Sequence, residues 1–326
     1  MKTIFQTKSV TVFCCAFLFL NINSCTSTKA LSENEINTFY SFSPETRVLI
    51  NSPQNNTNAK PLLLILYALP NGNTIEMTAG KKLSNSDDWH FDIQHIAAQT
   101  RFLRNTLRNY SIVVAYLENS LKSWPSWRRK YEHNSDDIAR IIQFVRFEIG
   151  EPQSVILSGH SGGGSFITGF INAFDSIPNY ITRIAYLDAN YSYDDSLNHG
   201  RKLLQWLNAD TTHKLCVIAY DDREIMLNGK KVVSPTGGTY RATQRMVQRF
   251  MEQTDVTLKQ DSTIKQYSAV NNRARFIIHT NPDTLILHTM LVEKNGFIHS
   301  ILFQTEFEQK NYKFFGQRAY SNFITN

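Results

Sequence analysis

A serine between glycines at residues 159–163 is the feature of this sequence with the clearest chemical meaning. The run Gly159-His160-Ser161-Gly162-Gly163 matches the pattern Gly-x-Ser-x-Gly. In this pattern a strand turns sharply into a helix, and glycines two positions before and after the serine leave room for the strained backbone. The turn presents the serine hydroxyl at the end of the strand, where it can act as a nucleophile. A match this short also arises by chance, so its surroundings decide its meaning.

The surroundings of Ser161 are those that the pattern requires. Residues 154–158 have an apolar centre, Val-Ile-Leu, which predicts a strand, and residues 165–171 have the pattern of a helix. A phosphate-binding loop is not favoured, because no Lys-Ser/Thr pair follows the glycines at the required spacing. We therefore interpret Ser161 as a candidate catalytic nucleophile. A glycine-rich turn without a catalytic role is the alternative.

Short apolar runs alternate with amphipathic segments along the rest of the chain. This alternation is typical of a mostly parallel sheet covered by helices, so we predict a single α/β domain over residues 38–326. The predicted strands are residues 38–43, 47–51, 61–68, 111–116, 154–158, 181–187, 215–220 and 284–291. The predicted helices are residues 93–107, 134–149, 165–171, 197–208 and 240–252. Asn228-Gly229, between apolar residues, predicts a β-hairpin.

Composition excludes several classes of protein. Of the 326 residues, 42% are hydrophobic and 19% are charged, which is enough to bury a large core and argues against disorder and against a polytopic membrane protein. The net charge is +6, but Lys and Arg are scattered, so we expect no nucleic-acid partner. The acidic and histidine residues between Asp87 and His95 are better explained by the start of a helix than by a metal site. We expect no metal and no cofactor.

The first 24 residues predict an export signal. Lys2 and Lys8 precede an apolar run, residues 10–20, that is too short to span a bilayer. The following Ile-Asn-Ser-Cys at residues 22–25 resembles the lipobox of bacterial lipoproteins. This resemblance implies that Cys25 is acylated and that the protein is anchored in the periplasm or at the outer membrane. An ordinary signal peptide, cut near Ser24 or Ala30, is the alternative.

The residues that follow the export signal predict a tether. Residues 25–37 are polar and without a periodic pattern, as in a flexible linker. Beyond Cys25, Cys216 is the one remaining cysteine, and it lies in an apolar run. An intramolecular disulfide and a zinc site built on cysteine pairs are therefore not expected.

The order of elements around Ser161 resembles the α/β-hydrolase superfamily of serine esterases, lipases and peptidases, from about residue 45 to the C-terminus. In that family the nucleophile follows the fifth strand, an acid follows a later strand, and a histidine lies in a loop near the end. The resemblance places the histidine at His299, after the last predicted strand, as general base. It places the orienting acid at Asp222, just past residues 215–220. Asp221 beside it and Asp188, at the end of residues 181–187, are the alternatives.

The resemblance also implies an oxyanion hole made of two backbone N–H groups. Gly162 supplies one of them. The loop at residues 70–73 supplies the other, and because its proline has no N–H, the donor is Gly72 or Asn73; we assign Asn73. Two tryptophans, Trp124 and Trp127, follow the predicted strand at residues 111–116 and are candidates for stacking a sugar ring or an aromatic acyl group. Packing within their loop is the alternative.

These features together predict an exported, lipid-anchored serine hydrolase. It would cleave a carboxylic ester of a small molecule or a glycan through an acyl-enzyme on Ser161. A peptidase or amidase of the same fold uses the same three side chains and is the alternative among enzymes. A lipoprotein that binds a glycan or lipid without catalysis is the alternative from a different class of protein.

Overall fold

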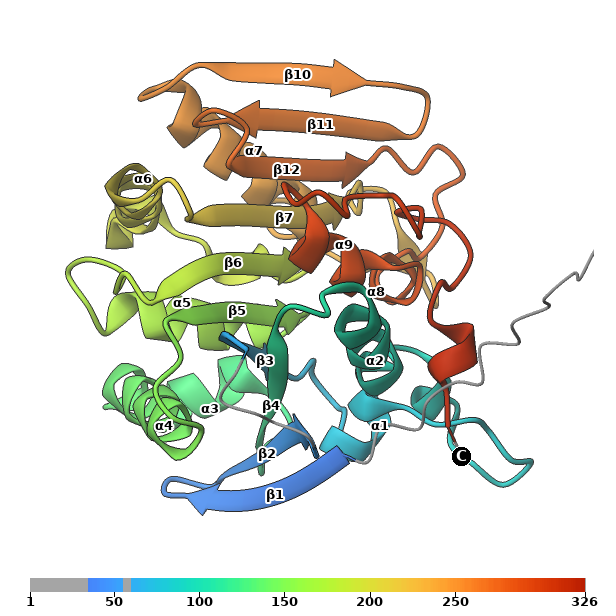
Figure 1. Ribbon diagram of the computed structural model, residues 1–326. Helices are drawn as coiled ribbons and strands as arrows, with labels where there is room; N and C mark the ends of the chain where they lie inside the picture. The colour runs from blue at the N-terminus through green and yellow to red at the C-terminus, as the bar shows by residue number, and fades with distance from the viewer. Residues whose placement is uncertain (1–34, 55–59, 326) are drawn as a thin grey trace, which may run out of the picture. The chain divides into compact units, whose positions relative to one another are not determined.

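A ten-stranded sheet forms the centre of the protein in the computed structural model, which describes residues 35–54 and 60–325 (Figure 1). The strand order across the sheet is β1-β2-β4-β3-β5-β6-β7-β12-β11-β10. The strands β4, β3, β5, β6, β7 and β12 run parallel to one another. The strands β1 and β2 at one edge, and β11 and β10 at the other, pair antiparallel. The predicted fold class, a mostly parallel sheet with helices on both faces, is confirmed.

The strands have the following bounds: β1 (Glu35–Phe42), β2 (Thr46–Pro53), β3 (Leu62–Ala68), β4 (Ser111–Asn119), β5 (Ser154–His160), β6 (Ile181–Leu187), β7 (Lys214–Tyr220), β10 (Val256–Gln260), β11 (Ile264–Ala269) and β12 (Ala274–His279). A separate hairpin joins β8 (Met226–Leu227) to β9 (Lys230–Lys231). Its turn residues Asn228 and Gly229 have φ angles of 50° and 74°, so the predicted hairpin is confirmed.

The α-helices have the following bounds: α1 (Ile75–Ala79), α2 (Ile96–Thr106), α3 (Trp124–Lys130), α4 (Asn134–Glu148), α5 (Gly163–Asn172), α6 (His199–Ala209), α7 (Thr239–Met251), α8 (Met290–Glu293) and α9 (Gly296–Leu302). Short 3₁₀ helices include η2 (Asn190–Ser192) and η4 (Ser321–Phe323). Among the described residues, no helix is both long enough and apolar enough to cross a membrane.

Side chains of each central strand alternate between two cores. In β3, Leu64 and Leu66 pack in the core formed with helices α3 to α7, whereas Leu63 and Ile65 pack in the core formed with α1, α2, α8 and α9. Because successive side chains of a strand point to opposite faces, a strand covered on both faces is apolar at every position. This is why the central strands could be found in the sequence as continuous apolar runs.

The prediction of a strand at residues 284–291 is wrong. Among the described residues the last strand is β12. The sequence prediction missed β10, β11 and β12. After β12, the backbone of Asn281 has φ 52°, and its side chain forms hydrogen bonds with both the N–H (3.0 Å) and the carbonyl (2.9 Å) of Leu285. Pro282 follows, and a proline cannot donate to a strand ladder. The apolar run 284–291 therefore begins as a loop, and α8 starts at Met290.

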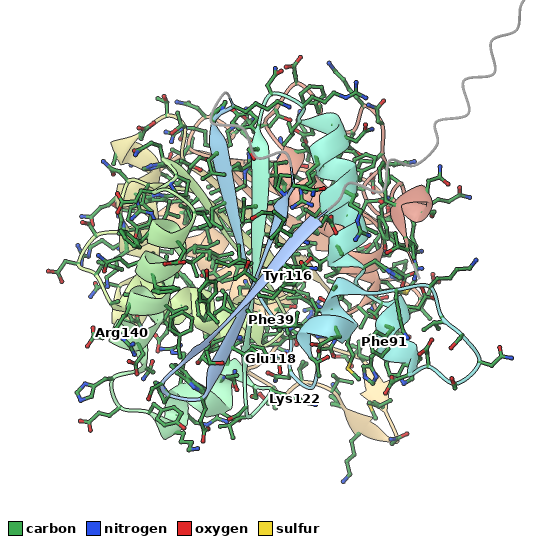
Figure 2. All side chains as sticks on the ribbon, turned by 60° about the horizontal axis from the view of Figure 1, so that its bottom comes forward. Phe39, Phe91, Tyr116, Glu118, Lys122 and Arg140 are labelled. Atoms are coloured by element: carbon green, nitrogen blue, oxygen red, sulfur yellow. The ribbon has the colours of Figure 1, made fainter. Side chains whose placement is uncertain are left out.

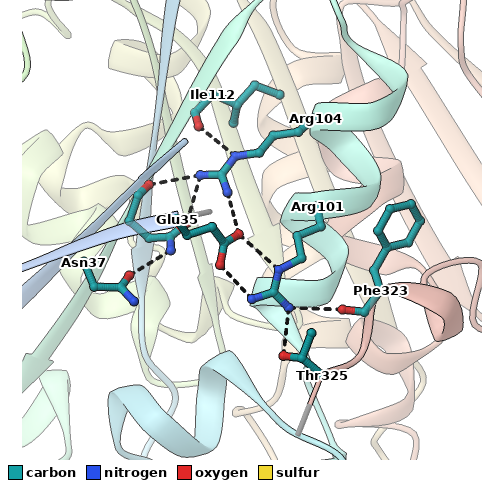
Figure 3. A network of polar contacts seen from close by, with 8 residues as sticks. Glu35, Asn37, Arg101, Arg104, Ile112, Phe323 and Thr325 are labelled. Carbon is teal, nitrogen blue, oxygen red and sulfur yellow. Dashed lines mark hydrogen bonds and ion pairs between the residues drawn. The ribbon is translucent and has the colours of Figure 1, made fainter. Parts of the chain in front are cut away.

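An ion-pair network holds β1 to the rest of the domain (Figure 3). The Glu35 carboxylate lies 2.7 Å from guanidinium nitrogens of both Arg101 and Arg104 on α2. Arg101 also donates to the carbonyl of Phe323 in the C-terminal segment at 3.1 Å. Residues 35–37, which the sequence assigned to the tether, therefore belong to the sheet. The predicted export signal and Cys25 lie outside the described residues.

Candidate active site

The turn around Ser161 has the geometry that its sequence pattern predicts. Strand β5 ends at His160, α5 begins at Gly163, and Ser161 between them has a φ of 53°. A positive φ is strained for any residue with a side chain. A Cβ at Gly163 would lie 2.1 Å from the carbonyl oxygen of Ala68, so only glycine fits there. The serine hydroxyl is thereby presented at the carboxyl edge of the sheet.

An imidazole–carboxylate pair lies at the same edge of the sheet. His288, in the loop after β12, has Nδ1 at 2.5 Å from Oδ2 of Asp188, which directly follows β6. The Asp188 side chain is fully buried, whereas the His288 side chain is 26% exposed. When Nδ1 carries the proton donated to Asp188, Nε2 has a free lone pair, and among the described residues Nε2 has no hydrogen-bond partner. This is the arrangement of a general base oriented by a buried carboxylate.

Ring contacts with His160 and with Tyr191, whose ring centroid lies 6.4 Å from that of His288, place His288 next to the serine turn. His160 immediately precedes Ser161, and its ring centroid lies 4.5 Å from that of His288. Its Nε2 donates to the backbone carbonyl of His288 at 3.0 Å. Burial and the neighbouring His288 lower the pKa of His160 well below its usual value, which keeps His160 neutral. Within the described residues no hydrogen bond joins Ser161 to His288; such bonds often tighten only when substrate is bound.

The structure does not bring His299, the predicted general base, to Ser161. His299 is on α9, 2% exposed, with Nδ1 at 3.1 Å from the Tyr312 hydroxyl and its ring stacked on Phe314. Burial lowers its pKa to about 4. Among the described residues it has no hydrogen bond to Ser161 or Asp222. The assignment of His299 is therefore corrected: its place is in the core, and the histidine beside the serine turn is His288.

The acid contact predicted for Asp222 is made by Asp188, the alternative. Asp222 follows β7 and is 1% exposed, and its Oδ2 accepts the N–H of Thr239 at 2.8 Å. No hydrogen bond joins it to a histidine among the described residues. Asp221, which is partly buried, pairs with Arg223 at 2.7 Å in the turn after β7.

A cavity of about 170 Å³ opens beside the serine. It is lined by Asn71, Pro125, Ser161, Gly162, Ser165, Ala189, Tyr191 and Ser192. The backbone N–H groups of Gly162 and Asn71 have no hydrogen-bond partner among the described residues. A Cβ at Gly162 would lie 2.0 Å from Oδ1 of Asn71, so the two residues are in close contact. Two free N–H donors next to a serine are what an oxyanion hole requires.

This geometry corrects the assignment of Asn73 as the second donor. The N–H of Asn73 points back to the carbonyl of Pro70 at 3.5 Å, and the N–H of Gly72 donates to the carbonyl of Lys122 at 2.8 Å. The Glu118 carboxylate accepts the N–H of Ile75 at 2.7 Å. Glu118 lies in β4 and Lys122 in the loop after it (Figure 2). Their hydrogen bonds hold the loop at residues 70–75 in place. The free N–H donor of this loop is that of Asn71.

The prediction that Trp124 and Trp127 stack a ligand is also corrected. Both side chains lie on α3 and are almost completely buried, with exposures of 1% and 0%. The Nε1 of Trp127 donates to the carbonyl of Pro44 at 3.0 Å, and the Trp124 ring packs on Phe166. Neither indole presents a face to a ligand. Packing, the alternative interpretation, is what the structure shows.

Sequence reasoning missed His288 and Asn71. The signal for His288 was present: the Asn281-Pro282-Asp283 turn marks the end of a strand and places the next histidine in a loop. The apolar residues around it were instead interpreted as a strand. For Asn71 no comparable signal exists, because the direction of a backbone N–H in a loop depends on the contacts that the loop makes.

Comparisons with known proteins find solved structures of low similarity. No protein-family model and no curated protein matches the chain. Among solved structures, a thermostable esterase shares 12% identity over 82% of this chain and 61% of its own, with a TM-score of 0.47. A prolyl endopeptidase shares 11% identity over 84% of this chain and 39% of its own (TM-score 0.43). An esterase from Thermogutta terrifontis shares 10% identity over 84% and 96% (TM-score 0.43).

The chain spans less than two thirds of the thermostable esterase and of the prolyl endopeptidase. Likenesses at these identities and TM-scores assign no activity and no residue to this chain. Its own strand order, together with the serine turn between β5 and α5, defines an α/β-hydrolase fold. The side chains that lie in the site, rather than the fold, determine its function.

Proposed function

We propose that this protein is a serine hydrolase that cleaves a carboxylic ester through an acyl-enzyme on Ser161, with His288 as general base and Asp188 as orienting acid. The observation that carries the proposal is the contact between the buried Asp188 carboxylate and His288, next to a serine in a strained strand-to-helix turn. A histidine that only packed in a loop would not require a fully buried carboxylate behind it.

The proposed reaction has two halves. Nε2 of His288 takes the proton of Ser161 Oγ as the oxygen attacks the ester carbonyl, and the N–H groups of Gly162 and Asn71 stabilise the oxyanion. The imidazolium returns its proton to the leaving alkoxide as the C–O bond breaks, which leaves the acyl-enzyme. Water, deprotonated by His288, then attacks the acyl group, and Ser161 regains its proton as the carboxylic acid leaves.

The site is compatible with one of the two alternative functions and gives no support to the other. A peptidase or amidase would use the same side chains, so comparison of an ester and an amide of the same acyl group decides between them. Non-catalytic glycan binding relied on Trp124 and Trp127, and the burial of both side chains removes its support. Export and acylation at Cys25 remain part of the proposal and concern residues outside the described part of the chain.

The test of the proposed function is labelling with a fluorophosphonate probe, which reacts with an activated serine. We expect one adduct per chain on the peptide that contains Ser161, and none on Ser161→Ala. Ser196→Ala, a change at an exposed serine in the short 3₁₀ helix Asp195–Leu197, serves as control and should be labelled like the wild type. Absence of labelling on the wild type, or equal labelling of Ser161→Ala, contradicts the proposal.

The size of the cavity predicts a preference for short acyl groups. At about 170 Å³ it is smaller than the roughly 300–1,000 Å³ of pockets that enclose drug-sized ligands. We expect kcat/KM for the acetyl ester of 4-nitrophenol to exceed that for the octanoyl ester by about 10- to 100-fold, because overpacking costs about 1–3 kcal/mol. Steady-state kinetics over a series of acyl lengths checks this, and a maximum at octanoyl would contradict it.

A further inference from the structure

Two buried carboxylates, not one, lie behind His288. Asp188 and Asp222 follow the adjacent strands β6 and β7 and are 0% and 1% exposed. Both contact Thr239, the first residue of α7. The Thr239 hydroxyl donates to Oδ1 of Asp188, and the Thr239 N–H donates to Oδ2 of Asp222 at 2.8 Å. The two acids are therefore linked through one residue.

The charge of this pair is poorly compensated. Among the described residues no Lys or Arg forms an ion pair with either carboxylate, and His288 is the one basic group in contact with Asp188. Oδ1 of Asp222 is buried without a hydrogen-bond partner. The other titratable groups that face the pair are the phenols of Tyr191 and Tyr220, which bring no positive charge.

This environment changes the titration of Asp222. Burial and the neighbouring charge of Asp188 raise the pKa of Asp222 to about 6, against the opposing effect of the N–H groups of Thr239 and Tyr240 at the start of α7. Below that pH the Asp222 carboxyl is neutral, and above it the carboxyl is ionised. Because Asp222 is buried, the charge of its ionised carboxylate interacts strongly with the neighbouring Asp188 and His288.

We propose that Asp222 and Thr239 are positioning residues behind the Asp188–His288 pair, and that Asp222 tunes His288 as a base by losing or gaining one proton. The inference rests on the proposed function of this site. The single hydroxyl hydrogen of Thr239 is given to Oδ1 of Asp188, which leaves Oδ2 to face His288. When Asp222 gives its proton to solvent, the second negative charge stabilises the imidazolium that forms as Ser161 attacks.

The direction in which kcat/KM changes with pH follows from the ionisation of Asp222. As the pH rises through about 6, Asp222 ionises and kcat/KM should rise with it. Asp222→Asn has nearly the same shape but carries no charge at any pH. Its kcat/KM should therefore match that of the wild type near about pH 5 and fall below it by about 3- to 30-fold near pH 8, as expected for loss of one neighbouring charge.

A control next to the site separates this effect from a general change of charge. Asp221→Asn removes a charge one residue away, but the Asp221 side chain is 21% exposed and pairs with Arg223. We expect no dependence of its effect on pH. Thr239→Val should lower kcat/KM because it removes the hydroxyl that orients Asp188, and Thr239→Ser should restore most of the rate.

A measurement that does not depend on catalysis accompanies the kinetics. A raised native pKa means that the folded protein holds the Asp222 proton more tightly than the unfolded chain, so stability falls as the pH rises from about 4 to about 6. Asp222→Asn removes this loss. Its urea midpoint, relative to the wild type, should therefore be higher near about pH 7 than near about pH 4.

The decisive experiment is the pH profile of kcat/KM for the wild type, Asp222→Asn and Asp221→Asn, together with urea unfolding of each and fluorophosphonate labelling. A wild-type to Asp222→Asn ratio that grows with pH supports the inference. A ratio that stays constant between about pH 5 and 8, in proteins that are folded and labelled, overturns it. Absence of labelling on the wild type overturns the proposed function instead, and the urea midpoints then still report whether Asp222 titrates as described.

Discussion

Replacing His288 by alanine is expected to lower kcat/KM by about 10⁴-fold or more, with little change in KM. Without the imidazole, Ser161 has no group to accept its proton, and the leaving alkoxide has no group to protonate it. The side chain is partly exposed, so its removal should leave the fold intact. Steady-state hydrolysis of the acetyl ester of 4-nitrophenol, with urea unfolding as a check on folding, measures the effect.

His299 provides the matched comparison for His288. Replacement by glutamine keeps a polar group that can bond to the Tyr312 hydroxyl, and His299 contacts neither the serine nor an acid of the site. We expect the His299→Gln protein to retain wild-type turnover within a few-fold and to be less stable, because a buried side chain has changed. Retained turnover in His288→Ala, with loss of turnover in folded His299→Gln, would restore the assignment made from the sequence.

Replacing Asp188 by asparagine is expected to lower kcat by about 10³- to 10⁴-fold. The carboxylate accepts the Nδ1 proton of His288 and thereby fixes the tautomer that leaves Nε2 free. An amide of the same shape no longer carries the charge that stabilises the imidazolium, and it can turn its NH₂ group toward Nδ1. His288 would then hold its proton on Nε2, facing Ser161, and could not act as base.

Asp222→Asn is the comparison for Asp188→Asn. Both acids are buried and both contact Thr239, so general damage to the site should affect the two variants alike. We expect the loss in Asp188→Asn to be large at every pH and the loss in Asp222→Asn to be small at low pH. Stopped-flow measurement of acyl-enzyme formation, run over a pH series, separates the two. If only Asp222→Asn loses turnover, Asp222 is the orienting acid.

The amino-acid sequence by itself determined the fold class and the position of the serine. The strand at residues 154–158, the glycines around Ser161 and the helix after them could be recognised because each depends on neighbours within a few residues. The same holds for the Asn228-Gly229 hairpin, whose turn residues adopt the positive φ angles that their types allow. Continuous apolar runs identified the central strands, because these are buried on both faces.

Only the tertiary structure decided which histidine and which acid stand by the serine. Ser161, Asp188, Asp222 and His288 follow β5, β6, β7 and β12, which are consecutive in the sheet and whose carboxyl ends share one edge (Figure 1). The sequence contained candidate acids at two of these ends. The choice depends on where α7 begins and how the loop after β12 folds back, and both depend on contacts between residues far apart in the chain.

The tryptophans of α3 show the same limit. A local pattern of Trp, Arg and Lys near the carboxyl edge of the sheet is compatible with a binding loop or with a short helix that packs inward. The tryptophan side chains are buried through contacts with Phe166 and Pro44, and neither of these residues is near the tryptophans in sequence. Local periodicity and turn chemistry determine which elements form, whereas the side chains that meet at a site depend on long-range packing, which a single sequence does not display.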